Sequence, residues 1–253
     1  MHTAVIQTYR TQDQPCWVAE CLASAKAWAE LNAWDYLFCG DEIFELVPQA
    51  LREKYALQLP LQIDIARLIW ARDLLRKNPT LERVVWLDAD VFVFDPESVY
   101  LDNTIDFAVG RQIWVQPTEG RALKTYKQVH NAILVFQKST PTLDFLLQTV
   151  LNLAERHDGP ATPQLLGPKL LTALHNIVGF SVIDTVGMVS PIVLADLAAG
   201  EGPALKCLTS ASPQSIGAVN LCTSYRGRTV NGIVCDDALF EAAIRKLAAS
   251  GLT

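Results

Sequence analysis

Two carboxylates interrupt an otherwise apolar segment, and this pattern restricts how the chain can fold. Residues 84–87 (VVWL) and 91–94 (VFVF) are apolar throughout, and Asp88, Ala89 and Asp90 lie between them. A continuous apolar run is typical of a strand that is covered on both faces. Unpaired carboxylates inside such a strand would cost several kcal/mol of stability. The pair must therefore emerge at the end of the strand or bind a cation.

The spacing of the pair predicts what it binds. In open α/β sheets, ligands bind at the carboxyl ends of the strands. If the chain stays extended, Asp88 and Asp90 project to one side, about 6.5 Å apart, and Ala89 points away. A bare carboxylate and a phosphate repel each other by about 4 kcal/mol at roughly 4 Å and an effective dielectric near 20. A divalent metal reverses that sign, because Mg²⁺ or Mn²⁺ binds one or two carboxylates plus phosphate oxygens.

The pair thus indicates a metal and a phosphate ester. The alternative is a strand-end cap next to a surface aspartate, without function.

Strand-like and helix-like segments alternate through the first half of the chain. Strands are predicted over residues 3–9, 35–39, 83–87, 107–110 and 132–136. Helices are predicted over 15–31, 62–77, 140–155, 164–175 and 237–249, with a short helix after Asp41. The alternation predicts an α/β fold with a largely parallel sheet. From Phe180 we expect short strands and loops. The second half of the chain is less regular than the first, and we expect any added antiparallel strands there.

Composition limits the function classes. The 253 residues are 50% hydrophobic and 19% charged, which is a globular composition, and the length favours one domain. The formal net charge of −6 gives no electrostatic reason to bind nucleic acid. No apolar run reaches the roughly 18 residues of a membrane span, and the N-terminus lacks the features of a signal peptide. We expect a cytoplasmic protein, with peripheral attachment at a membrane left open, and the sequence predicts no oligomeric state.

An ordered set of short motifs resembles the glycosyltransferases that carry a DXD sugar-binding region. These include the initiating mannosyltransferases and the lactosylceramide galactosyltransferases. The matching segments are 6–9 (IQTY), 32–36 (NAWDY), 64–67 (DIAR), 88–90 (DAD), Asn131 and 167–172 (GPKLLT). Two segments depart from the family: the glycines that usually precede the DXD are absent, and Asn220 and Tyr225 replace a histidine and a tryptophan near the C-terminus.

The resemblance implies a GT-A-like fold: a Rossmann-like mixed sheet with helices on both faces, in a single domain over residues 1–253. Residues 1–110 would form the nucleotide-binding half. Residues 111–253 would form the acceptor-side half with a C-terminal loop for metal and diphosphate.

The resemblance also implies roles for individual residues. Asp88, Asp90 and Asn220 would hold Mn²⁺ or Mg²⁺, and Asn220 is a weaker ligand for Mn²⁺ than histidine. Tyr9, Ala89, Ser224 and Tyr225 would contact the nucleotide and its diphosphate together with the aspartates. The implied catalytic set is Asp64, Arg67, Asn131 and Lys169. An intrahelical ion pair is the alternative for Asp64 and Arg67, and an ordinary helix start is the alternative for Gly167 to Lys169.

The expected function is metal-dependent hexosyl transfer from a nucleoside-diphosphate sugar, a UDP- or GDP-sugar, to an acceptor hydroxyl. The resemblance favours retention of anomeric configuration and a glycan, polysaccharide or glycolipid acceptor. Two alternatives stay open. One is a haloacid-dehalogenase-like phosphatase, which also places Asp-x-Asp after an apolar strand and would use Lys169 and the acidic pair Asp236-Asp237. The other is a non-catalytic domain that binds a sugar nucleotide.

Overall fold

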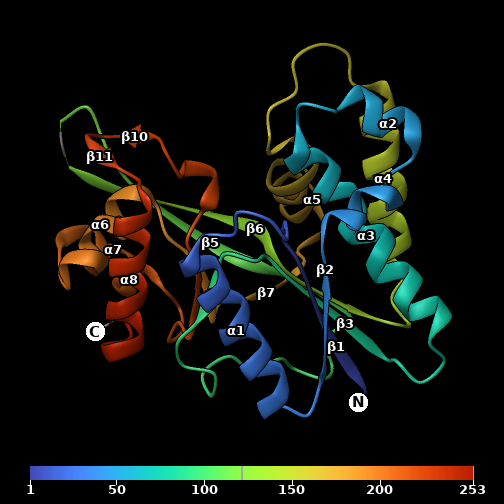
Figure 1. The fold of residues 1–253 in the computed structure, drawn as a ribbon, viewed down its shortest axis with the longest axis horizontal. Helices are drawn as coiled ribbons and strands as arrows, with labels where there is room; N and C mark the ends of the chain where they lie inside the picture. Colours follow the sequence, from blue (N-terminus) through green and yellow to red (C-terminus); the bar gives the residue numbers. More distant parts are fainter. Residues whose placement is uncertain (121, 253) are drawn as a thin grey trace.

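A computed structural model describes residues 1–120 and 122–252 (Figure 1). The strands are β1 (Thr3–Thr8), β2 (Asp35–Cys39), β3 (Arg83–Leu87), β4 (Val91–Val93), β5 (Phe107–Pro117), β6 (Leu123–Gln137), β7 (Ser181–Ile183), β8 (Val186–Met188), β9 (Ala218–Asn220), β10 (Thr229–Val230) and β11 (Ile233–Val234). The α-helices are α1 (Cys16–Leu31), α2 (Gln49–Lys54), α3 (Leu59–Lys77), α4 (Thr142–Arg156), α5 (Leu170–Val178), α6 (Pro191–Ala199), α7 (Pro203–Ala211) and α8 (Asp237–Ser250). Short helical segments η1 (Asp41–Leu46), η2 (Leu165–Lys169) and η3 (Thr223–Tyr225) complete the set.

The central sheet has six strands in the order β2-β1-β3-β6-β5-β7. The three N-terminal strands are parallel, as the alternating pattern predicts. β6 then pairs antiparallel with β3 and with β5, and β7 joins β5 in parallel. The sheet is therefore mixed, which confirms the expected fold class. The expected place of the antiparallel strands is confirmed only for most of β6, because β5 lies in the first half of the chain and β7, from the second half, is parallel to β5.

A second sheet starts where the two aspartates lie. β4 leaves the central sheet directly after β3 and pairs antiparallel with β9, and β9 pairs in parallel with β8. The apolar runs on the two sides of the aspartates thus belong to different sheets. Both runs are buried: the residues of β3 and β4 are at most 8% exposed. A small β10–β11 hairpin lies between β9 and α8 in the sequence.

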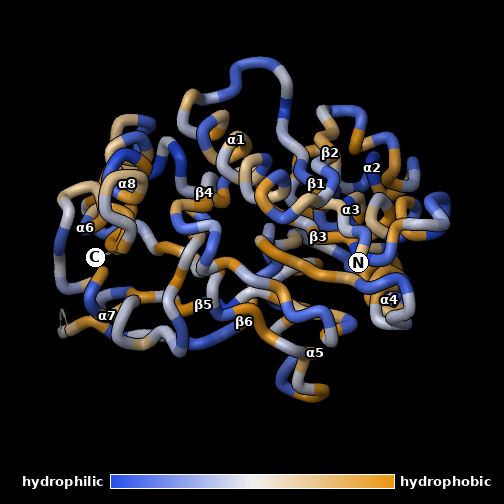
Figure 2. The backbone as a smooth tube through the Cα atoms, turned by 90° about the horizontal axis from the view of Figure 1, so that it is seen from below, coloured by the Kyte–Doolittle hydropathy of each residue, from blue (hydrophilic) through white to orange (hydrophobic). Residues whose placement is uncertain are grey.

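Helices cover both faces of the central sheet. α3, α4 and α5 pack on one face, against Ala4, Trp86, Leu134 and Phe136 among others. On the other face α1 packs through Ala25, Trp28 and Ala29 against β3 and the three-stranded sheet. In Figure 2 the hydrophobic stretches of the strands run through the interior, and hydrophilic segments lie at the periphery. No helix within the described residues has the length and apolar character needed to cross a bilayer.

One prediction for the C-terminal third of the chain is corrected by the structure. The expected short strands and loops after Phe180 are partly wrong, because α6 and α7 occupy residues 191–199 and 203–211. Together with α8 and the N-terminal end of α1 they form a further core, into which β5 inserts Ile113 and Val115. Figure 1 shows β5 and β6 extending toward these helices, well beyond the predicted strands 107–110 and 132–136.

Candidate functional site

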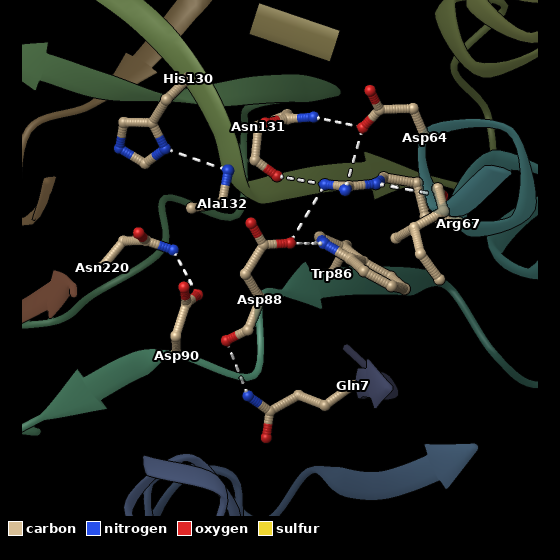
Figure 3. Close-up of polar contacts among 11 residues, drawn as sticks. Gln7, Asp64, Arg67, Trp86, Asp88, Asp90, His130, Asn131, Ala132 and Asn220 are labelled. Carbon is tan, nitrogen blue, oxygen red and sulfur yellow. Dashed lines mark hydrogen bonds and ion pairs between the residues drawn. The ribbon is translucent and has the colours of Figure 1, made fainter. Parts of the chain in front are cut away.

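The site is built around the turn that joins β3 to β4. The Val91 amide donates to the Asp88 carbonyl at 3.1 Å, so residues 88–91 form a tight turn. The expectation of an extended chain is wrong here, because the strand leaves one sheet and enters another within three residues. As a result, the two carboxylates have separate sets of partners, which Figure 3 shows on opposite sides of the turn.

Arg67 connects the first carboxylate to helix α3. Its guanidinium lies 3.0 Å from Asp64 Oδ1 and 3.1 Å from Asp88 Oδ1, and it donates to the Asn131 carbonyl at 2.8 Å. The same guanidinium lies 4.6 Å from the centre of the Trp86 ring. Asp64 and Arg67 thus form the i,i+3 ion pair, and Arg67 also reaches the β3–β4 turn. A contact of either side chain with a donor sugar stays a prediction.

Asp64 is the most deeply buried carboxylate of this network. Burial raises its pKa to about 7, while Arg67 and the Asn131 amide act in the opposite direction and the charge of Asp88 adds to the rise. Its Oδ1 accepts from Asn131 Nδ2 at 2.7 Å as well as from Arg67. A group with this pKa changes its ionisation near neutral pH.

Asp90 has a second, independent set of partners. Its Oδ1 accepts from Asn220 Nδ2 at 2.6 Å, and its Oδ2 accepts from the Thr223 amide and hydroxyl, each at 2.7 Å. Burial raises the pKa of Asp90, the nearby charge of Asp88 raises it further, and the bonds from Thr223 lower it. Asn220 Oδ1 accepts from the Cys222 amide, so in this arrangement the nitrogen of Asn220 is directed toward Asp90.

Three segments that are far apart in the sequence meet at Asn131. We expected Asn131 to begin a strand, but it lies inside the longer β6, opposite an irregularity in the β5 pairing. Gly167, in η2, packs directly against it: a Cβ on Gly167 would overlap the Asn131 amide and would lie 2.7 Å from Asp64 Oδ2. A small cavity lined by Asp64, Arg67 and Asn131 on its polar side and by Leu134 on its apolar side opens here.

The remaining predicted residues are Tyr9, Tyr225, Ser224 and Lys169. Tyr9 follows β1, and burial raises the pKa of its phenol, with the charges of Arg10, Arg226 and Asp90 also acting on it. Tyr225 follows Thr223 in η3 and lies against Trp114, with ring centroids 5.8 Å apart. Ser224 is exposed. Lys169 is exposed and donates to Thr162 at 3.1 Å, with no contact to the network among the described residues.

Several residues of the site were missed by the sequence reasoning. Trp86 Nε1 donates to Asp88 Oδ1 at 2.6 Å, and Gln7 Nε2 donates to the Asp88 carbonyl at 3.1 Å. Trp86 could have been found, because residues i and i+2 share one side of a strand. Gln7 could also have been found, because a polar side chain inside the apolar β1 needs a partner. Nothing in the sequence places Thr223 next to Asp90.

His130 is a further missed residue. Its Nδ1 accepts from the Ala132 amide at 3.0 Å, which leaves Nε2 to donate to the Val186 carbonyl at 3.2 Å. Burial lowers its pKa to about 4, so the ring is neutral at physiological pH. The ring also lies against Gly110, where a Cβ would overlap it. His130 thus connects β6 to β8 beside the site.

The donor set fits a divalent cation that takes most of its ligands from phosphate and water. A carboxylate offers about four lone-pair positions. Asp88 Oδ1 uses two, Asp90 uses three, and Asp88 Oδ2 accepts no bond from the described residues. The described residues contain no cluster of three His, Cys, Asp or Glu side chains that could enclose a metal. A cation between the two aspartates would relieve their repulsion, and two carboxylates match the usual protein share of a Mg²⁺ site.

Comparisons with known proteins address the fold. A scan of family models and a search of curated sequences return no match. Among solved structures, the chain is similar to a glycosyltransferase involved in the glycosylation of the major capsid of PBCV-1. The TM-score is 0.50 at 14% identity, over 87% of this chain and 94% of that chain. The galactosyltransferase LgtC, solved with donor and acceptor sugar analogs, is more distant, with a TM-score of 0.44 at 13% identity over 95% of each chain.

At these identities the likeness shows the fold and not the activity. It agrees with the six-stranded mixed sheet and with the helices on its two faces. The chain is therefore a single α/β domain of the GT-A-like fold class.

Proposed function

We propose that this protein is a glycosyltransferase that binds a nucleoside-diphosphate sugar through a divalent cation at Asp88 and Asp90. One observation carries the proposal. The two aspartates occupy the turn at the carboxyl end of β3, where open α/β sheets bind ligands, and each is oriented by its own buried network. The resemblance of the motifs and the similarity of the fold support the same conclusion.

In this proposal the residues of the site have different roles. Asp88 and Asp90 hold Mn²⁺ or Mg²⁺, with Asn220 beside Asp90 as a further oxygen ligand if its amide rotates. The cation supplies Lewis-acid stabilisation of the departing diphosphate. Asp64, Arg67 and Asn131 face the donor sugar, and Arg67 also keeps Asp88 in position.

Other residues would contact the nucleotide, and the acceptor is a hydroxyl compound. Tyr9 contacts the nucleobase of a UDP- or GDP-sugar, and Ser224 and Tyr225 contact the diphosphate together with the Ala89 backbone. Lys169 is the residue whose proposed role has the least support, because its ammonium is bonded to Thr162. The transfer goes to a hydroxyl of a glycan or glycolipid, and the motif resemblance favours retention.

The structure offers no support for the phosphatase alternative. That alternative needs Lys169 and the Asp236-Asp237 pair close to Asp88. Asp237 instead forms an ion pair with Arg226 at 2.5 Å and accepts from Trp17, while Asp236 caps helix α8. The non-catalytic alternative and the proposal both predict that the protein binds a sugar nucleotide. Only a measurement of activity distinguishes them.

A thermal-shift screen of nucleoside diphosphates and their sugars, with and without Mn²⁺, tests the proposal. A ligand at about 100 times its Kd stabilises the folded state by about 2.7 kcal/mol, which raises Tm by roughly 5–10 °C for a chain of this size. We expect one nucleotide to give this shift, and only with Mn²⁺. Release of the nucleoside diphosphate from its sugar then identifies an enzyme. Asp90→Asn should lose the shift, and Asp144→Asn, at a 60% exposed position on α4, is the matched control that should keep it.

The alternatives predict different results in the same experiment. Binding without any release would support the non-catalytic domain. Hydrolysis of a generic phosphomonoester that Asp88→Asn abolishes would support the phosphatase. No shift with any nucleotide would contradict the proposal.

A further inference from the structure

On one face of the long β5–β6 hairpin, the described side chains between residues 112 and 128 are half-buried or exposed. Beyond Gly110 the two strands pair from Gly110–His130 to Pro117–Leu123. Their buried face inserts Ile113 and Val115 into the C-terminal core. The opposite face carries six side chains in three cross-strand pairs: Gln112 with Gln128, Trp114 with Tyr126, and Gln116 with Lys124. All six are half-buried or exposed.

The six side chains alternate between amides and aromatic rings. Trp114 and Tyr126 lie directly opposite each other at the centre, and the Lys124 ammonium lies 4.9 Å over the Tyr126 ring. The amides of the three glutamines make no hydrogen bond with other described residues. Two aromatic surfaces and three unused amides therefore lie side by side on a sheet face that extends about 13 Å along the strands.

This face continues into the candidate site. Tyr225 lies against Trp114, and Tyr225 belongs to the same short helix as Thr223, whose amide and hydroxyl bond Asp90. His130 lies on the same side of β6 two residues beyond Gln128, but it is fully buried, so the open face ends before it and Tyr225 and Thr223 form the link to the site. A molecule lying along the hairpin would thus have one end close to the Asp88–Asp90 turn.

The chemistry of the face selects the class of ligand. Amides donate and accept hydrogen bonds equally well, which suits hydroxyl groups. Aromatic rings provide flat apolar surface at low entropic cost. Of the six side chains only Lys124 is charged, and the whole chain has a net charge of −6, so a polyphosphate or nucleic acid finds little electrostatic attraction. A neutral ligand with many hydroxyl groups and an extended shape fits this surface.

We propose that this face of the β5–β6 hairpin binds the acceptor as a neutral oligosaccharide longer than one sugar unit. The inference rests on the proposed function and makes it more specific: the acceptor is a glycan chain, and it is recognised along Trp114 and Tyr126 at a distance from the reacting hydroxyl. Longer acceptors therefore bind more tightly than monosaccharides, because they cover more of the face.

The test uses two variants and one control. Trp114→Ala and Tyr126→Ala remove the rings from the face, and Trp114→Phe keeps an aromatic ring there if the alanine variant folds poorly. Tyr100→Ala is the control, because Tyr100 is a 60% exposed aromatic residue that bonds Gln214 outside the hairpin. Calorimetry with Mn²⁺ and the identified nucleoside diphosphate measures the binding of glucans, mannans and galactans, from monosaccharide to hexasaccharide.

We expect one oligosaccharide series to bind wild-type protein and Tyr100→Ala with affinity that rises with length. Trp114→Ala and Tyr126→Ala should weaken the longer members by about tenfold, as loss of an aromatic contact predicts, with Trp114→Phe between. Equal affinity in all variants, no dependence on length, no binding of any series, or binding of peptides instead would overturn this inference. The Mn²⁺-dependent nucleotide shift of wild-type protein should persist unchanged in the control Tyr100→Ala. Its absence from wild-type protein would contradict the proposed function itself.

Discussion

Replacing Arg67 with methionine removes the guanidinium that lies between Asp64 and Asp88. The Arg67 and Asp64 side chains are 7% and 5% exposed, so the ion pair is poorly screened by solvent. Removing one member of a buried ion pair costs about 3–5 kcal/mol. Methionine preserves much of the aliphatic volume, so the loss reports the charge and its hydrogen bonds.

The stability that Arg67→Met loses depends on pH, because Asp64 changes its ionisation near neutral pH. Its pKa is about 7 in the folded protein, above the ordinary value of 3.8. The stability associated with protonated Asp64 is therefore complete below about pH 4 and is lost as pH rises to about 7, in total about 4 kcal/mol. Without Arg67 the pKa rises further. At pH 8 we expect Arg67→Met to lose about 3–5 kcal/mol. At pH 5 Asp64 is protonated in both proteins, and the loss falls to about 1–2 kcal/mol from the contacts with Asp88 and Trp86.

Urea unfolding followed by circular dichroism measures the loss of unfolding free energy at pH 5 and at pH 8. Arg76→Met is the control, because Arg76 pairs with Asp144 at 2.9 Å but both side chains are about 60% exposed. It should lose no more than about 1 kcal/mol. The reasoning is refuted if Arg67→Met and Arg76→Met lose the same amount at pH 8. It is also refuted if the loss from Arg67→Met does not change with pH.

Two further predictions concern the contacts around the turn. Gly167→Ala should lower the free energy of unfolding in urea by about 1–3 kcal/mol, because the added Cβ overlaps the Asn131 amide. Gly120→Ala is the control and should leave the free energy of unfolding almost unchanged, because the space around Gly120 is open. Equal losses in the two variants would count against close packing at Gly167. Trp86→Phe keeps the ring but removes the indole N–H that bonds Asp88, so calorimetry should show Mn²⁺-dependent nucleotide affinity reduced by about three- to tenfold. Unchanged affinity would mean that this bond does not orient Asp88.

The sequence was sufficient to predict the framework of the site. The apolar run before Asp88 predicted a buried strand, and the structure places β3 over those residues. Helix α3 carries Asp64 and Arg67 on one face, as their i,i+3 spacing requires. Local patterns of this kind survive folding because burial on a defined face determines them.

Elements that depend on tertiary partners were predicted less well. The first half of β6 carries Lys124, Lys127 and Gln128 and has no apolar run, because these side chains are exposed. Its strand structure comes from pairing with β5. α6 and α7 are only nine residues long and begin with Pro191 and Pro203. Short apolar runs of that length do not distinguish a helix from a strand.

Local patterns do not predict the partners of Asp90: the motif resemblance placed Asn220 beside it, and nothing in the sequence indicated Thr223. Asn220 and Thr223 follow it by 130 and 133 residues. They reach it because β4 pairs with β9 in a register that matches Val91 to Asn220. The choice of strand partner and register depends on the complete fold. The turn at Asp88–Val91 has the same origin, since it exists only because β4 joins a second sheet.

The most direct test of the central claim is calorimetry of the identified nucleoside diphosphate with wild-type protein and with Asp90→Asn, each with Mn²⁺ and after chelation by EDTA. Asparagine keeps the shape of the side chain and removes the charge, but its Nδ2 is a donor that must face either Asn220 Nδ2 or the Thr223 amide and hydroxyl. Circular dichroism of Asp90→Asn therefore accompanies the calorimetry and must show that the variant is folded. We predict that Asp90→Asn in Mn²⁺ binds the nucleotide about 100-fold more weakly, as wild-type protein does in EDTA, a loss of about 2.7 kcal/mol. Wild-type affinity in Asp90→Asn, with or without Mn²⁺, would contradict the claim that this turn holds a metal and a diphosphate.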